Sequence, residues 1–211
     1  MRIDIISDTI CPWCYVGKRH LETALAARPD VVAELYWHPF ELHPDMPVEG
    51  MDSRDFYETK FGSQERMEEV LSNVEGAGRA AGIHFAYDRI DRVPNTVRSH
   101  ALIRWASRFG EQTAAAEALF HAYFIEGRDI GDVQVLTDVA EDLGLPADEA
   151  VTWITGEESL TAVRRVAMQI KQMGIDGVPC YVIAEKYAVV GAQPPEAFVA
   201  ILDKALAQEA E

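Results

Sequence analysis

Residues 7–17, Ser-Asp-Thr-Ile-Cys-Pro-Trp-Cys-Tyr-Val-Gly, lead from an apolar strand into a helix that begins with two cysteines three residues apart. In a helix this spacing separates two residues by about 5–6 Å, which lies within the range that a disulfide spans without backbone movement. Cys11 and Cys14 can therefore alternate between a dithiol and a disulfide.

The two cysteines are expected to have different roles. Cys11 lies at the predicted helix start, where free backbone N–H groups and the positive end of the helix dipole stabilise an anion, so we predict it to be the nucleophilic thiolate. Cys14 lies one turn further, on the apolar side of the helix, and is the predicted resolving thiol. Pro12 suits the first turn because no hydrogen bond is lost there, and with Trp13 it keeps the turn stiff.

The cysteine pair could also belong to a zinc site or be an inert structural pair. Half of a zinc site would need a second pair of ligands, and none follows at zinc-finger or zinc-ribbon spacing, so we expect no metal. An inert pair is also conceivable, because most buried cysteines behave as small hydrophobic residues. The position at a strand-to-helix junction favours redox chemistry over both.

Composition limits the class of protein. The 211 residues include 35 acidic and 19 basic side chains, and the net charge of -16 argues against a nucleic-acid partner. The sequence shows neither an export signal nor an apolar stretch of membrane-spanning length, so we expect a cytoplasmic protein without a membrane partner. In that compartment thiols stay reduced, so a single Cys-x-x-Cys is expected to be catalytic and to need no other cofactor.

The first forty residues predict a strand at 2–7, a helix at 12–27 and a second strand at 33–40. The right-handed crossover of such a unit makes the two strands parallel. Cys11 then lies just beyond the carboxyl end of the first strand, where open α/β sheets form their sites.

A proline-rich loop at 41–50 leaves the sheet, and the following hundred residues are predicted to be helical. The expected N-caps there are Ser53, Ser63 and Asn95, and further helices are expected at 112–126 and 133–143. Val97, Ala101, Leu102, Trp105 and Phe109 form the expected apolar stripe after Asn95.

The C-terminal part returns to α/β patterning. It predicts a helix at 158–173, two strands at hairpin spacing at 180–184 and 187–191, a last helix from about 194 to 207, and an acidic tail that frays. Residues 1–50 and 157–211 should thus form one discontinuous unit, with residues 51–156 inserted in it.

This order of elements, with Cys-Pro-Trp-Cys at a helix start and Gly177-Val178-Pro179 before the hairpin, resembles the thioredoxin-fold DsbA family and most closely its FrnE-like branch. Weaker motifs that carry the resemblance are Ser7-Asp8, Tyr15 to Lys18, Trp37 with Pro39 to Leu42, Pro94 to Thr96, Ala122 to Phe124, and Gly191 to Gln193. The resemblance implies an α/β thioredoxin-like fold with a large all-helical insertion domain.

The resemblance also implies a function. We expect a thiol-disulfide oxidoreductase of the reductase or isomerase type, acting on disulfide-bearing proteins or small-molecule thiols, with a cellular thiol reductant such as glutathione as redox partner. It implies a cis peptide bond before Pro179, with the backbone of Val178 pairing to an extended substrate. FrnE-like proteins include dimers, so a homodimer is one expected assembly.

Two positions depart from the family pattern. Ile5 stands where many thioredoxin-like proteins bury a carboxylate that takes the proton of the second cysteine, so Asp8 and Glu41 are the candidates for that task, although each is also typical of a loop or capping carboxylate. Cys180 replaces a frequent aromatic residue; it is expected in the core of its strand, with a third redox thiol as the alternative.

Other polar residues near the predicted site have both functional and structural interpretations. His38 and His43 could tune Cys11 or simply be satisfied structural groups. His100 begins a stripe with Arg104 and Arg108 that could receive an anionic substrate such as glutathione, or could be a solvated helix face.

Two rival functions remain open at this point. Kinship with kappa-class glutathione transferases and 2-hydroxychromene-2-carboxylate isomerases suggests a glutathione-dependent enzyme, but a serine usually takes the first catalytic position there. A non-enzymatic holdase would bind unfolded segments through an exposed Trp13 and the apolar walls between the two lobes.

Overall fold

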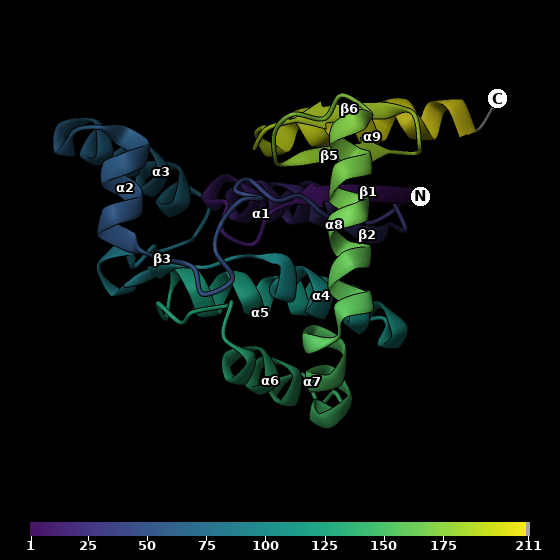
Figure 1. The fold of residues 1–211 in the computed structure, drawn as a ribbon. Coiled ribbons are helices and arrows are strands. Elements are labelled where there is room, and N and C mark those ends of the chain that lie inside the picture. The colour runs from purple at the N-terminus through teal and green to yellow at the C-terminus, as the bar shows by residue number, and fades with distance from the viewer. Residues whose placement is uncertain (210–211) are drawn as a thin grey trace.

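The computed structural model describes residues 1–209 and contains a four-stranded sheet in the order β2-β1-β5-β6 (Figure 1). Strand β1 (Arg2–Ser7) pairs in parallel with β2 (Glu34–Pro39) and antiparallel with β5 (Cys180–Ile183). Strand β6 (Tyr187–Val190) completes the antiparallel hairpin with β5. The predicted parallel pair and the predicted hairpin are both confirmed.

Helices cover both faces of this sheet. Side chains alternate between the faces along each strand, so Ile5 and Tyr181 join the large core that includes α1 (Pro12–Ala27) and α9 (Pro195–Glu209). On the other face Ile6 packs against α8 (Glu157–Gln172). Helix α8 crosses the sheet in front and leads down to the insertion (Figure 1).

The helical insertion packs beside edge strand β2. Its core helices are α4 (Val97–Ala106), α5 (Gln112–Phe124), α6 (Val133–Asp142) and α7 (Ala147–Thr155). Helices α2 (Ser53–Phe61) and α3 (Gln64–Ala80) form a hairpin near the start of α1, away from α6 and α7 (Figure 1). Short 3-10 helices occupy Tyr87–Arg89 and Ser107–Phe109.

Some local expectations were wrong. The insertion also holds a two-stranded ladder of β3 (Met51–Asp52) and β4 (Arg92–Val93), whose two-residue strands are too short to show a periodic pattern. Asp52, not Ser53, caps α2, because its carboxylate accepts the N–H groups of the first helical turn. Phe109 is 41% exposed, since α4 ends at Ala106 and the stripe does not continue.

Other local expectations hold or are shifted slightly. Ser63 caps α3 as predicted. Helix α4 starts one residue later than predicted, with Thr96 at the cap position, while the Asn95 side chain still accepts a hydrogen bond from the Val97 N–H. Helix α7 was not anticipated.

Among residues 1–209, no helix is long and apolar enough to cross a membrane. The predicted fraying of the acidic tail concerns residues beyond 209, which lie outside the described part of the chain. The proposed boundaries of the two units, 1–50 with 157–211 and 51–156, stay a prediction.

Candidate active site

The two cysteines lie where the first strand passes into the first helix. After β1 the Asp8 carbonyl accepts a hydrogen bond from the Cys11 N–H at 3.0 Å, which closes the turn. Cys11 is the N-cap residue of α1 in extended conformation, and its carbonyl accepts the Cys14 N–H at 3.0 Å. Pro12 is the first helical residue, where its missing N–H removes no helical bond. The predicted position of Cys11 at a helix start is therefore confirmed.

Cys11 faces the loop that precedes β5. Its thiol is 4% exposed and donates a weak hydrogen bond to the Val178 carbonyl, with 3.8 Å between Sγ and oxygen. The Val178–Pro179 peptide bond is cis, as the resemblance implied. Trp13 beside Cys11 is 39% exposed, so the rim of the site offers an apolar surface to solvent.

Cys14 lies deeper than Cys11. Burial raises the pKa of its thiol well above the ordinary value, and the neighbouring Cys11 raises it further, although the Ser7 hydroxyl and the Asp8 backbone act in the opposite direction. All three cysteines of the chain are thiols in this structure. Cys14 therefore holds its proton firmly, and using it as a nucleophile requires a group that removes this proton.

Three buried polar side chains converge at the carboxyl ends of β1 and β2. Asp8 is fully buried, and its Oδ2 accepts the Leu42 N–H at 2.7 Å. Its Oδ1 lies 3.4 Å from Nε2 of His100, which is 4% exposed. Glu41 is also buried; desolvation raises the pKa of this carboxyl, with His100 opposing and Asp8 reinforcing the shift. The structure thus brings both predicted proton acceptors together, and adds a histidine to them.

The remaining candidates lie further from the thiols. His38 pairs with Asp4 at 2.6 Å, so its contact is with β1 and not with Cys11. Cys180 is buried with Ile6 on the face of the sheet that α8 covers, whereas Cys14 belongs to the core on the opposite face. Its expected place in the strand core is confirmed.

Asn95 and the basic stripe have mainly structural contacts. The Asn95 side chain donates to the Met46 carbonyl at 2.7 Å and so ties the 41–50 loop to α4. Arg104 and Arg108 are exposed, but His100 is buried, so the three do not form one solvated face. His43 packs edge-on against Phe56, and burial lowers its pKa.

A close contact between α1 and β5 was missed in the sequence. A Cβ added at Gly17 would lie 2.3 Å from the Tyr181 hydroxyl and 3.1 Å from Pro179 Cγ. Glycine is disfavoured inside helices, and its occurrence one turn after Cys14 was the available signal. Gly17 therefore allows β5 and the Pro179 loop before it to approach the cysteine helix.

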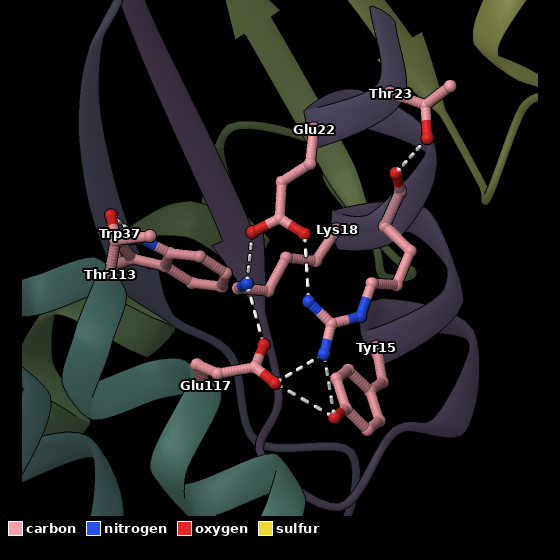
Figure 2. Close-up of polar contacts among 8 residues, drawn as sticks. Tyr15, Lys18, Glu22, Thr23, Trp37, Thr113 and Glu117 are labelled. Atoms are coloured by element: carbon pink, nitrogen blue, oxygen red, sulfur yellow. Dashed lines mark hydrogen bonds and ion pairs between the residues drawn. The ribbon is translucent and has the colours of Figure 1, made fainter. Parts of the chain in front are cut away.

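A polar network joins α1 to the insertion (Figure 2). Lys18 is only 4% exposed, and its ammonium pairs with Glu22 of the same helix and with Glu117 of α5, the latter at 2.7 Å. Arg19 reaches the other Glu117 oxygen at 2.5 Å, and that oxygen also accepts the Tyr15 hydroxyl at 2.9 Å. Nearby, the Trp37 indole N–H of β2 donates to Thr113 of α5 at 3.0 Å.

This network positions the redox helix. Lys18 follows Cys14 by four residues, so the contact fixes the first two turns of α1 against α5. Sequence patterning did not reveal it, because the partner Glu117 lies about a hundred residues further along the chain. Elsewhere, within residues 1–209, no group of three or more His, Cys, Asp or Glu residues is arranged to hold a metal ion.

Comparisons with known proteins agree with this geometry. Residues 2–203 match the family described as the DSBA-like thioredoxin domain. The crystal structure of a probable DsbA oxidoreductase from Streptomyces coelicolor is 32% identical, with a TM-score of 0.88 over 98% of this chain and 90% of that one. The uncharacterised protein YwbO of Bacillus subtilis is 26% identical over 213 residues, covering 99% of this chain and 97% of its own.

A third relative shares the fold at lower identity. The cytosolic disulfide reductase DsbM from Pseudomonas aeruginosa, solved with GSH, is 19% identical, with a TM-score of 0.69 over 98% of this chain and 99% of that one. The α/β thioredoxin-like fold with its helical insertion, α4 to α8, is therefore shown.

Proposed function

This chain belongs to the DSBA-like thioredoxin domain family, and from that membership we propose that its Cys11–Cys14 pair exchanges disulfides through a mixed-disulfide intermediate. The Cys11 thiolate attacks one sulfur of a substrate disulfide, forms a bond to it and releases the other sulfur as a thiolate. Deprotonated Cys14 then attacks Cys11 Sγ, which breaks the mixed disulfide and releases the second substrate thiolate. Two electrons pass to the substrate and the protein becomes the Cys11–Cys14 disulfide.

One observation carries this proposal. Two thiols lie one turn apart at the start of α1, and the outer one contacts the carbonyl that precedes a cis proline. An extended substrate segment beside Val178 would place its sulfur next to Cys11. The 39% exposed Trp13 would add an apolar contact at the rim.

We further propose that this protein belongs to the FrnE-like branch and acts as a reductase or isomerase in the cytoplasm. The disulfide reductase DsbM, which shares the fold, is described as cytosolic. A cellular thiol such as glutathione would then return the Cys11–Cys14 disulfide to the dithiol, and the clients would be disulfide-bearing proteins or small thiols.

The decisive experiment combines insulin reduction by dithiothreitol with reactivation of scrambled ribonuclease. Wild type should accelerate both, and Cys11→Ser should accelerate neither. Cys14→Ser should accumulate the mixed disulfide, seen as a mass increase equal to the bound substrate. Cys180→Ala is the matched control, because it removes a buried thiol on the other side of the sheet. Equal activity of Cys11→Ser and wild type would refute the proposal.

Glutathione-dependent catalysis is the second candidate, because the related DsbM was solved with GSH. Calorimetric titration of the reduced protein with glutathione distinguishes it. A stoichiometric complex that also forms with Cys11→Ser would favour glutathione as a bound cofactor. Heat seen only when the oxidised protein, with its Cys11–Cys14 disulfide, is titrated, and absent from Cys11→Ser, would assign it to thiol exchange.

A further inference from the structure

A small cavity lies at the carboxyl ends of β1 and β2, where α4, α5 and α8 meet the sheet. Its volume is about 190 Å³, which leaves room for more than one water molecule. The polar residues that line it are Ser7, Thr9 and His100, together with the more exposed His38 and Arg104. This cavity lies between the interior of the site and the surface.

Ser7 connects this cavity to the resolving cysteine. Ser7 lines the cavity, and its side chain lies close enough to Cys14 to lower the pKa of that thiol. Ile5 occupies the strand position where related folds bury a carboxylate, so β1 provides no acid or base at that point. Ser7 is thus the polar group between Cys14 and the cavity. Ile5 offers no carboxylate there, and Asp4, the acidic residue of β1, is already paired with Arg2 and His38.

His100 has the geometry of the missing acceptor. Its Nε2 lies 3.0 Å from the Phe40 carbonyl, and because a carbonyl only accepts, Nε2 carries the proton in the neutral ring. Nδ1 is then the basic nitrogen, and none of the hydrogen bonds found among residues 1–209 involves it. Asp8 Oδ1, 3.4 Å from Nε2 and otherwise unpaired within the described chain, is placed to stabilise the imidazolium that forms on protonation.

From these contacts we propose that the Asp8–His100 pair accepts the Cys14 proton through Ser7 and cavity water. The inference rests on the proposed function and supplies its missing proton acceptor. The Cys14 S–H bond breaks as its proton moves to Ser7 or water and finally to His100. The resulting thiolate forms the bond to Cys11 Sγ, and the departing substrate thiolate takes up a proton from solvent. His100 then returns its proton to the cavity water.

Other charged groups face this pair and enter its pH dependence. Glu41 interacts electrostatically with both His100 and Asp8, and the charges of Arg164 and Lys171 on α8 act on Glu41 in turn. His38 lies on the cavity wall but is held by Asp4. Arg104 lines the outer side of the cavity and has no carboxylate partner in the described structure. Asp8 is the only carboxylate that directly contacts His100 among residues 1–209.

Stopped-flow reaction of the reduced protein with excess Ellman's reagent separates the two steps. The first release of thionitrobenzoate reports attack by Cys11, and its rate depends on reagent concentration. The second release reports attack by buried Cys14 on Cys11, and its rate does not. In His100→Ala we expect an unchanged first phase and a second phase about 100-fold slower at pH 7, the usual contribution of a general base.

Two readouts distinguish proton transfer from a structural role. Added imidazole should enter the enlarged cavity and accelerate the second phase of His100→Ala, with little effect on wild type. The rate of the second phase in His100→Ala should keep rising with hydroxide concentration, whereas the wild-type rate should reach a plateau. Asp8→Asn, which retains an oxygen for the Leu42 N–H, should slow the second phase as well.

The outcomes separate this inference from the proposed function. His121→Gln, at an exposed site on α5, is the matched control and should behave as wild type. A His100→Ala second phase equal to wild type, or a slow one that imidazole does not accelerate, would overturn the inference alone. Absence of both phases in wild type would overturn the proposed function. If His100→Ala does not fold, as judged by circular dichroism, His100→Asn is tested in the same way.

Discussion

Replacing Gly17 by alanine tests how closely β5 approaches the cysteine helix. The new methyl group would lie 2.3 Å from the Tyr181 hydroxyl and 3.1 Å from Pro179 Cγ, both well inside contact distance. Alanine would contribute about 1 kcal/mol in helix propensity, while overpacking of a core costs about 1–3 kcal/mol. Because the Tyr181 side chain is fully buried and cannot swing into solvent, we expect a net loss of about 1–2 kcal/mol of unfolding free energy.

Two further variants make this prediction specific. Gly76 lies on exposed α3 with no heavy atom within 4 Å of an added Cβ, so Gly76→Ala should raise stability by about 0.5–1 kcal/mol. The Tyr181 hydroxyl has no hydrogen-bond partner among the described residues, so Tyr181→Phe alone should be nearly neutral. In combination, Tyr181→Phe should restore most of the stability lost in Gly17→Ala.

Urea denaturation followed by circular dichroism measures wild type and the four variants, and insulin reduction reports whether Pro179 has moved. Equal or greater stability of Gly17→Ala relative to wild type would refute the close-approach argument. A Gly17→Ala defect that Tyr181→Phe leaves unchanged would show that the hydroxyl is not the obstacle.

The remaining predictions concern other contacts. Burial raises the pKa of Glu117, but its bonds to Lys18 and Arg19 bring that pKa below the ordinary 4.5. Glu117→Gln should therefore lower the free energy of unfolding by about 1–3 kcal/mol at pH 7. That difference should shrink as pH falls through the lowered pKa, because a protonated Glu117 makes the same contribution as glutamine; urea titrations at several pH values test this. Asp52→Ala should cost about 1 kcal/mol by loss of the α2 cap, and Ser53→Ala much less, by the same method. Cys180→Ala should lower stability but leave insulin reduction unchanged, since the Cys180 thiol lies across the sheet from Cys14. Loss of insulin reduction in this variant would show that Cys180 is a third redox thiol.

The local parts of the fold were predictable because each has a short-range cause. The strand-to-helix junction at Cys11, the extent of α1 and the parallel pairing of β1 with β2 follow from hydrophobic pattern and crossover handedness. Helix α7 was not predicted because it begins directly after Pro146, and a proline suits the end of one helix as well as the start of the next.

The long-range parts of the candidate site were not predictable in the same way. Asp8, Glu41 and His100 were each noticed, but nothing in the sequence shows that residues 8 and 100 come within 3.4 Å. The burial of Lys18 against Glu117 likewise depends on where α5 packs, a hundred residues along the chain. No periodic pattern carries that information.

The sequence alone thus determined the chemistry: two thiols one helical turn apart at the end of a strand, in a chain without a second set of metal ligands. Tertiary structure decided what surrounds those thiols, namely the cis Val178–Pro179 loop against Cys11 and the Asp8–His100 pair at the end of β1. The reason is physical. Helix geometry fixes neighbours three or four residues apart, but only the packing of the insertion against the sheet brings His100 of α4 to Asp8 at the end of β1.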